Sequence, residues 1–421
     1  MVSVQKVFFK TFGCRTNVFD TEIMRSCLRD FSVTQQEEQA DIVVVNSCTV
    51  TNGADSSVRS YIRRLNAIGK KVYLSGCGVH TQGERLYNDG LVFGVFSHAF
   101  REKINDILMQ EQRIFECKEN ELVDSKIVPE VIGKSRAFIK IQEGCDFSCS
   151  YCIIPSVRGR ARSQSKEKIY EQIALLCDIG FTEFVLTGTN MGSYGKGLGD
   201  IFSDSLATLI KNISKIQGVR RIRLGSLEPS QIDAEFKELL GEPFMAKHLH
   251  IALQHTDDEM LKIMNRKNYF MQDLELFEEI ADKGYALGTD YIIAHPGESQ
   301  ERFEKGFKRL EQLPLTHIHP FIYSKRDNTV SAKFMQETKG DEAKQRLKRV
   351  NDLIAQKNYA FRKNIQNQKI PLQILIENSS QQCLSGLDQY YNRMVLENGV
   401  MGFWVELTNY QVEDKNNYGK I

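Results

Sequence analysis

Three cysteines spaced C-x3-C-x2-C are the residues of this chain best suited to do chemistry. They are Cys145, Cys149 and Cys152, within the run 144–152. A loop with this spacing can wrap a cubic iron–sulfur cluster and offer thiolates to three of its four irons, whereas electron carriers supply four. The fourth iron then stays open to substrate or cofactor, like the open position of a catalytic metal.

An alternative interpretation makes these cysteines a buried helix stripe, because positions i, i+4 and i+7 share one helix face and free cysteine packs as a small hydrophobe. The intervening residues argue against a helix. Gly144, Asp146, Ser148 and Ser150 are poor helix formers, and Pro155 follows closely. The segment therefore predicts a cluster-binding loop between a strand and a helix.

Three more cysteines follow predicted strands in residues 1–120. The strands are 7–12, 41–45 and 71–74, and the cysteines after them are Cys14, Cys48 and Cys77. Apolar strands alternating with helical stretches predict a doubly wound parallel sheet, whose strand carboxyl ends form the ligand crevice. We expect the three thiols to converge there as a second metal site with three ligands; the alternative is three unrelated buried cysteines.

The middle of the chain, 134–335, follows a linker at 117–135 that contains Pro129 and Gly133, and it predicts a partial (β/α)6 barrel. Helical patterns fall between its strand-like runs, at 166–178, 231–240 and 302–312. The runs themselves are 136–141, 183–186, 221–224, 248–253, 286–293 and 316–323. This regular alternation is typical of parallel barrels. The cysteine loop leaves the carboxyl end of the first strand, the active-site face of such barrels.

The C-terminal part divides into a helical connector, 341–366, and a small β-barrel, 367–421. Between Lys333 and Lys369 there are ten basic and four acidic residues, but six acidic and three basic residues follow. Strand patterns at 372–376 and 403–407, with a hairpin signal at Asn398-Gly399, predict the barrel.

Bulk composition is that of a soluble globular protein, with 41% hydrophobic and 26% charged residues over 421 positions. The sequence has no apolar stretch long enough for a membrane span and no leader pattern at its start, so we expect a cytoplasmic monomer without a membrane partner. Ten cysteines there predict metal ligands or core residues rather than disulfides. A net charge of +1 gives no overall signature of a nucleic-acid binder.

An open iron at a barrel mouth suits the reductive cleavage of S-adenosylmethionine, in which the cofactor supplies the reactive radical and the protein positions it. Polar or small residues at later strand ends, with one residue of the cysteine loop, are the candidate cofactor contacts: Tyr151, Gly188, Asn190, Glu228, Gln254 and Arg266. Two histidine pairs, 248/250 and 317/319, could share strand faces. We favour packing over metal binding for them, because no third ligand is apparent.

The cysteine loop, with Ile153-Ile154-Pro155 and Arg158-Gly159-Arg160 after it, resembles the radical S-adenosylmethionine methylthiotransferases. The N-terminal cysteines match that family's second set, and the C-terminal barrel is similar to its TRAM domain. The resemblance implies that the loop cysteines hold the radical-generating [4Fe-4S] cluster. It also implies an auxiliary [4Fe-4S] cluster on the N-terminal set that delivers sulfur, two uses of S-adenosylmethionine, an external electron donor and a sulfur source.

The run Gly13-Cys14-Arg15-Thr16-Asn17 is similar to the branch that methylthiolates C2 of N6-threonylcarbamoyladenosine beside the tRNA anticodon. We expect Lys344, Lys348 and Arg349 of the basic connector to contact that tRNA. The sequence departs from the family at Gln254-His255-Thr256-Asp257 and at His295. These departures weaken the cofactor assignments nearby.

Branches that act on isopentenyladenosine or on a ribosomal-protein aspartate remain open, as does a non-catalytic iron–sulfur RNA-binding redox sensor. Lipoyl synthase is disfavoured, since its auxiliary cysteines are closely spaced whereas Cys14, Cys48 and Cys77 are far apart. The remaining cysteines are interpreted as structural: Cys27, Cys117, Cys177 and Cys383.

Overall fold

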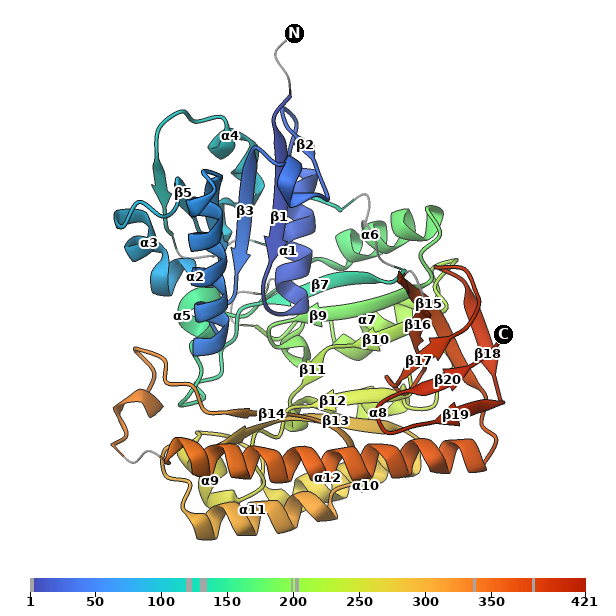
Figure 1. The fold of residues 1–421 in the computed structure, drawn as a ribbon. Helices are drawn as coiled ribbons and strands as arrows, with labels where there is room; N and C mark the ends of the chain where they lie inside the picture. Colours follow the sequence, from blue (N-terminus) through green and yellow to red (C-terminus); the bar gives the residue numbers. More distant parts are fainter. Residues whose placement is uncertain are drawn as a thin grey trace.

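The computed structural model describes residues 4–118, 123–128, 135–197, 200, 204–335, 338–380 and 383–421, and the side chains of all of these except 378–380 and 383. Pro129 and Gly133 of the expected linker lie outside the described residues. An N-terminal α/β unit stands above a central strand layer, a C-terminal sheet lies beside that layer, and a long helix runs beneath both (Figure 1).

The N-terminal unit is a six-stranded parallel sheet of order β2-β1-β3-β4-β5-β6. The strands are β1 (Lys6–Thr11), β2 (Ser32–Val33), β3 (Ile42–Ser47), β4 (Lys71–Gly76), β5 (Gly94–Phe96) and β6 (Ile114–Glu116). Helices α1 (Arg15–Ser26), α2 (Asn52–Ala67), α3 (Glu84–Asn88) and α4 (Ile104–Leu108) connect them. β3 is central and buried along its whole length, as its unbroken apolar run requires. The expected doubly wound sheet is confirmed.

The central strands form the expected partial barrel from two parallel sheets, β10-β9-β7-β8 and β11-β12-β13-β14, in which only the short β8 is antiparallel. Its strands are β7 (Ala137–Glu143), β8 (Arg162–Ser163), β9 (Glu183–Gly188), β10 (Arg221–Leu224), β11 (Ser226–Leu227), β12 (His248–Ile251), β13 (Ala286–Ile293) and β14 (Leu315–Ile322). Between β10 and β11 the chain passes from one sheet to the other through Gly225.

Helices that follow these strands are α5 (Ile154–Arg158), α6 (Lys166–Asp178), α7 (Leu206–Ile213), α8 (Ala234–Glu238), α9 (Asp258–Ile263), α10 (Phe270–Asp282) and α11 (Gln300–Gln312). The helix expected over 231–240 is shorter than predicted. Asp233 caps the start of α8 by accepting a hydrogen bond from the Phe236 amide, and a separate turn precedes it.

One hydrophobic core continues from the N-terminal sheet into the barrel, through residues such as Phe9, Ile23, Ile139 and Leu249. A second core, with Val43, Ile62 and Leu74, lies under α2 on the other face of the sheet. The N-terminal unit is therefore packed against the barrel through α1.

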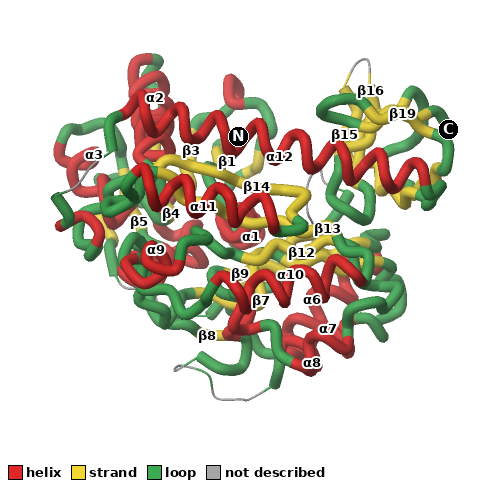
Figure 2. The backbone as a smooth tube through the Cα atoms, turned by 90° about the horizontal axis from the view of Figure 1, so that it is seen from below, coloured by secondary structure: helices red, strands yellow, loops and turns green. Residues whose placement is uncertain are grey.

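The connector is the helix α12 (Gly340–Asn367), which runs along the barrel and reaches the C-terminal sheet (Figure 2). It carries many charged residues, and among the described residues no helix is long and apolar enough to cross a membrane.

The C-terminal strands curl into a half-barrel of order β18-β15-β16-β17-β20-β19. They are β15 (Leu372–Ser380), β16 (Cys383–Leu387), β17 (Arg393–Leu396), β18 (Trp404–Leu407), β19 (Tyr410–Val412) and β20 (Asn417–Gly419). The prediction of a hairpin at Asn398-Gly399 is wrong. The segment joins β17 to β18, but β17 pairs with β16 and β20 whereas β18 pairs with β15.

Candidate functional site

The cysteine loop leaves the end of β7 and returns as α5, so its three thiols lie at the carboxyl edge of the barrel strands. Gly144 has φ +78°, and a Cβ there would lie 1.9 Å from the carbonyl oxygen of Arg160. The Cys145 amide donates to the Gly159 carbonyl at 3.1 Å. The chain therefore doubles back on itself, and only glycine fits at its start.

The loop thiols lie close enough to influence one another. Burial, together with the neighbouring charges of Cys149 and Cys145, raises the pKa of Cys152 to about 12. Burial likewise raises the pKa of Cys145. Three adjacent thiolates in a half-buried place need a cation among them, and this sulfur-only donor set fits an iron–sulfur cluster.

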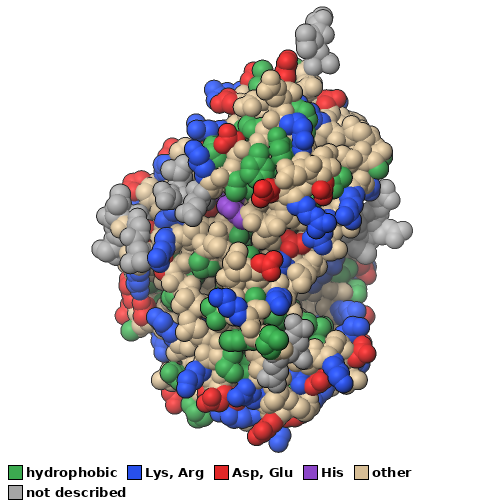
Figure 3. Space-filling model, turned by 90° about the vertical axis from the view of Figure 1, so that its left-hand side faces the viewer, with side chains coloured by type: hydrophobic (Ala, Val, Ile, Leu, Met, Phe, Trp, Pro, Cys, Tyr) green, Lys and Arg blue, Asp and Glu red, His purple; other side chains and the backbone are tan. Residues whose placement is uncertain are grey.

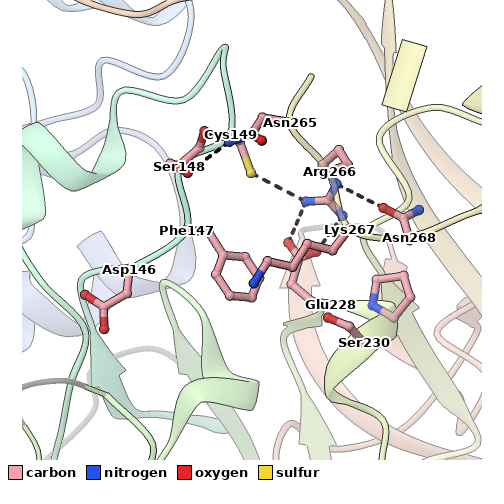
Figure 4. A pocket seen from close by; sticks show the side chains of 11 residues that line it. Asp146, Phe147, Ser148, Cys149, Glu228, Ser230, Asn265, Arg266, Lys267 and Asn268 are labelled. Carbon is pink, nitrogen blue, oxygen red and sulfur yellow. Dashed lines mark hydrogen bonds and ion pairs between the residues drawn. The ribbon is translucent and has the colours of Figure 1, made fainter. Parts of the chain in front are cut away.

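A polar pocket of about 130 Å³ opens beside Cys149 (Figure 4). Arg266 lies in its wall, with Nη2 2.5 Å from Glu228 Oε2 and Nη1 3.8 Å from Cys149 Sγ. The pocket therefore presents a carboxylate and a guanidinium next to the thiol where a cluster would lie.

Asn190 and Gly188 flank the other side of the loop. The Asn190 side chain approaches Cys145 Sγ at 3.6 Å, and its buried Oδ1 has no hydrogen-bond partner among the described residues. A Cβ at Gly188 would lie 2.9 Å from the carbonyl oxygen of Gln142. Neither residue lines the pocket beside Cys149: Asn190 lies next to Cys145, and Gly188 lies against Gln142 of β7.

Tyr151 and Gln254 do not line that pocket. The Tyr151 ring packs near Met260, Met264 and Ile292. Gln254 has φ +67°, bridges to β13, and leaves its buried Oε1 without a hydrogen bond among the described residues.

Sequence reasoning missed most of the pocket wall, which comes from three segments distant in sequence: Asp146, Phe147, Ser148, Pro229, Ser230, Asn265, Lys267 and Asn268. Asn265 secures one side by donating from Nδ2 to the Ser148 carbonyl at 2.7 Å. The polar run Asn265–Asn268, directly after the helix α9, is the feature of the sequence that could have indicated this wall.

The N-terminal cysteines follow β1, β3 and β4, which are neighbours in the sheet. A Cβ at Gly13 would lie 2.6 Å from the Cβ of Cys48, so the turn before Cys14 packs closely against Cys48. The pKa of Cys77 is raised to about 12, mainly by burial and also by the charges of Cys14 and Cys48, while the charge of Arg158 opposes the shift. The three thiols therefore share one crevice, and their donor set is again sulfur alone.

Arg158 connects this crevice to the loop. It extends from α5 into the N-terminal unit, where Nη2 lies 2.9 Å from Asp20 Oδ2 and 2.5 Å from Asn17 Oδ1. His98 Nε2 lies 3.5 Å from Cys77 Sγ. The contacts of Arg158 were not expected from sequence, because α5 and α1 are more than a hundred residues apart. The contact between His98 and Cys77 was not expected either, since it depends on how the chain folds back after β4.

A groove of about 730 Å³ runs between the loop and the N-terminal unit, lined in part by Cys145, Arg160 and His80. The face seen in Figure 3 carries basic and acidic side chains interspersed, in keeping with the small net charge. On α12, each expected tRNA-contacting residue pairs with a carboxylate: Lys344 with Asp341, Lys348 with Asp352, and Arg349 with Glu304.

Comparison with known proteins places these sites in context. Residues 6–96 match the uncharacterized protein family UPF0004, and residues 139–310 match the radical SAM superfamily. A Helicobacter pylori protein provisionally named a methylthiotransferase is 52% identical over 99% of both chains.

Two named tRNA-modifying enzymes are also similar. The threonylcarbamoyladenosine tRNA methylthiotransferase MtaB of Aquifex aeolicus is 32% identical, over 89% of this chain and 93% of its own. The tRNA-2-methylthio-N(6)-dimethylallyladenosine synthase of Staphylococcus haemolyticus is 29% identical, over 97% and 83%.

Among solved structures, the radical S-adenosylmethionine methyltransferase TsrM of Kitasatospora setae matches with a TM-score of 0.55. It covers 78% of this chain and 77% of its own at 15% identity, a likeness of fold.

Proposed function

This chain belongs to the radical S-adenosylmethionine methylthiotransferase family, and we propose that it methylthiolates C2 of N6-threonylcarbamoyladenosine beside the anticodon of tRNA. Family membership implies S-adenosylmethionine and a [4Fe-4S] cluster as cofactors. The substrate proposal is supported by the similarity to the Aquifex enzyme and by the run from Gly13 to Asn17. With this substrate, the enzyme would work in the cytoplasm.

We propose that Cys145, Cys149 and Cys152 hold the radical-generating cluster, with S-adenosylmethionine in the adjoining pocket. When bound, these cofactors supply a carbon radical that can abstract hydrogen from an unactivated C–H bond. Glu228 offers carboxylate oxygens to the ammonium or hydroxyl groups of the cofactor, and Arg266 holds Glu228 in place through their ion pair. Asn190 offers its Oδ1, which has no hydrogen-bond partner in the described part of the chain, from the side of Cys145.

Cys14, Cys48 and Cys77 would hold an auxiliary [4Fe-4S] cluster that delivers the sulfur. The observation that carries this proposal is the second convergence of three thiols, in a crevice that Arg158 joins to the first. The fixed positive charge of Arg158 offsets part of the negative charge of a thiolate-ligated group. His98 restrains Cys77 from the other side.

The contribution of α12 to tRNA binding rests on Lys344 and Lys348, whose side chains are 75% and 76% exposed. Arg349 instead makes two hydrogen bonds to Glu304 of α11, at 2.5 and 2.9 Å, so its removal would disturb helix packing. We therefore expect Lys344→Gln with Lys348→Gln to lower tRNA affinity and its salt dependence. Unchanged affinity and salt slope would exclude this role.

Two measurements test the function. Mass spectrometry of tRNA nucleosides and ribosomal proteins from a deletion strain should show loss of the methylthio group from threonylcarbamoyladenosine only. Loss from isopentenyladenosine instead would favour the branch of the Staphylococcus relative, and loss from a ribosomal protein would favour the third branch.

In vitro, alanine at Cys145, Cys149 or Cys152 should abolish formation of 5′-deoxyadenosine. Alanine at Cys14, Cys48 or Cys77 should spare it and abolish only thiolation. If reconstituted, reduced wild-type protein formed no deoxyadenosine, a non-catalytic iron–sulfur RNA-binding protein would be the better description. Such a protein would need neither the external electron donor nor the sulfur source that the catalytic proposal requires.

A further inference from the structure

Histidine and aspartate side chains gather on neighbouring strands of the barrel, in a group that contains no cysteine. His250 lies on β12, Asp290 on β13 and His319 on β14. Asp290 is directly opposite His319 in the strand register, and His250 is opposite Gly288, two residues before Asp290. Residues two apart share a strand face, so all three side chains project to the same side.

Their geometry is that of a metal-ligand set. His250 Nε2 lies 3.2 Å from Asp290 Oδ2, and His319 Nδ1 lies 3.7 Å from Asp290 Oδ1. The three candidate donor atoms lie within 4.8 Å of one another. With metal–ligand bonds of about 2.0–2.1 Å, donors in a tetrahedral site are roughly 3.3 Å apart. Small side-chain adjustments therefore suffice to bring all three onto one ion.

Charge distinguishes this group from the other such cluster in the described part of the chain, Asp20, His98 and Glu143. That cluster is buried, and Lys140 and Arg158 already neutralise its carboxylates. The ion pairs of Asp290 among the described residues, by contrast, run only to His250 and His319. The negative charge of Asp290 is therefore not balanced by a lysine or arginine among the described residues, and a bound cation could balance it.

The residues around His250, Asp290 and His319 leave space for their side chains and access from solvent. A Cβ on Gly288 would lie 3.0 Å from His250 Nδ1 and 3.1 Å from His248 Nε2, so glycine provides the space for these rings. The side chain of His319 is 64% exposed, which gives an ion a route from solvent. The histidine pairs in the sequence lacked a third ligand, and the fold supplies it from the intervening strand.

We propose that His250, Asp290 and His319 bind one divalent transition-metal ion of the Zn²⁺ or Fe²⁺ class, separate from the iron–sulfur clusters. Two imidazoles and a carboxylate suit these ions, and three protein ligands leave open positions for water or a substrate group. The site is independent of which nucleoside the enzyme modifies. Beside the site, the ring of His248 stacks on that of Tyr391 with centroids 4.8 Å apart, and Tyr391 in turn contacts Arg15 of the N-terminal unit.

The test is zinc binding to the full-length protein after its clusters have been reconstituted, so that cysteines are occupied. Equilibrium dialysis with Zn²⁺ should give one zinc per chain. X-ray absorption should show nitrogen and oxygen neighbours at about 2.0–2.1 Å and no sulfur at about 2.3 Å. No zinc beyond the background, or a shell that contains sulfur, would overturn the proposal.

Variants separate this site from unspecific binding. Asp290→Asn and His319→Gln should each weaken zinc binding at least tenfold. His319→Gln changes an exposed side chain, so it should leave the circular dichroism spectrum unchanged even if Asp290→Asn perturbs folding. His80→Gln, at the distant groove, is the control and should retain zinc. Equal affinity in wild type and His319→Gln would refute the assignment, as would an equal loss in His80→Gln.

Discussion

Arg158 of the barrel places its guanidinium 2.9 Å from the carboxylate of Asp20 in the N-terminal unit. Both side chains are almost fully buried, and Arg158 also contacts Glu143 at 2.6 Å. Because Arg158 follows the cysteine loop by a single helical turn, this ion pair fixes the loop relative to the N-terminal crevice. The separation of the two proposed cluster sites is thereby set by a buried charge contact.

Replacing Arg158 with methionine should lower the free energy of unfolding by about 3–5 kcal/mol, since Asp20 and Glu143 lose a buried partner. Guanidinium unfolding followed by circular dichroism would measure the change. Arg160→Met is the matched control. Its side chain is 75% exposed and lies 3.6 Å from Asp146, so about 0–1 kcal/mol is expected. Equal effects in both variants would contradict the assigned role of Arg158.

Gly144→Ala should prevent cluster assembly on the loop. An added Cβ would meet the Arg160 carbonyl oxygen at 1.9 Å, and the loop cannot close without moving. Gly284→Ala is the control, because its φ of +79° nearly equals the +78° of Gly144 but its Cβ would meet nothing within 4 Å. Iron analysis after reconstitution should show fewer irons only in Gly144→Ala. Full iron content there would show that the close approach is dispensable.

Glu228→Gln should raise the Kd for S-adenosylmethionine by about 10–100-fold, since hydrogen bonds to a charged group contribute about 1.5–3 kcal/mol. The neutral amide loses the attraction for a cationic ligand while keeping the shape. Equilibrium dialysis of cluster-loaded protein measures the change, with iron content expected to stay the same. Glu235→Gln, on α8 and hydrogen-bonded to Thr208, should bind normally. An unchanged Kd in Glu228→Gln would remove Glu228 from the cofactor site.

Acid should destabilise the protein partly through His295. Burial lowers the pKa of His295 from 6.5 to about 4, so the folded state holds it neutral while the unfolded state takes up a proton below pH 6.5. Stability present above that pH is therefore lost as the pH falls from 6.5 towards 4, by up to about 1.4 kcal/mol per pH unit. Unfolding at several pH values should give His295→Gln a shallower slope than wild type. Parallel slopes would show that His295 is not the titrating group.

The sequence alone determined much of this protein, because the relevant signals are local. Continuous apolar runs such as Ile42–Val45 indicated buried parallel strands, and helix α6 begins and ends where its pattern predicted. The spacing of Cys145, Cys149 and Cys152 indicated a loop, since glycine and serine disfavour the helix that would make the same cysteines a stripe. The pairing of strands was harder to predict from the sequence, as the wrong prediction of a hairpin at Asn398-Gly399 shows.

Only the tertiary structure decided which distant residues meet. Arg158 reaches Asp20, and Asn265 closes the pocket beside Cys149, each across more than a hundred residues of chain. Arg158 also reaches the crevice that contains Cys77. Asp290 became a candidate ligand when β13 was seen to lie between β12 and β14. Local propensity cannot specify such contacts, because they depend on how the strands are ordered in the sheet. The cysteines could be identified from the sequence, but their partners could be identified only from the fold.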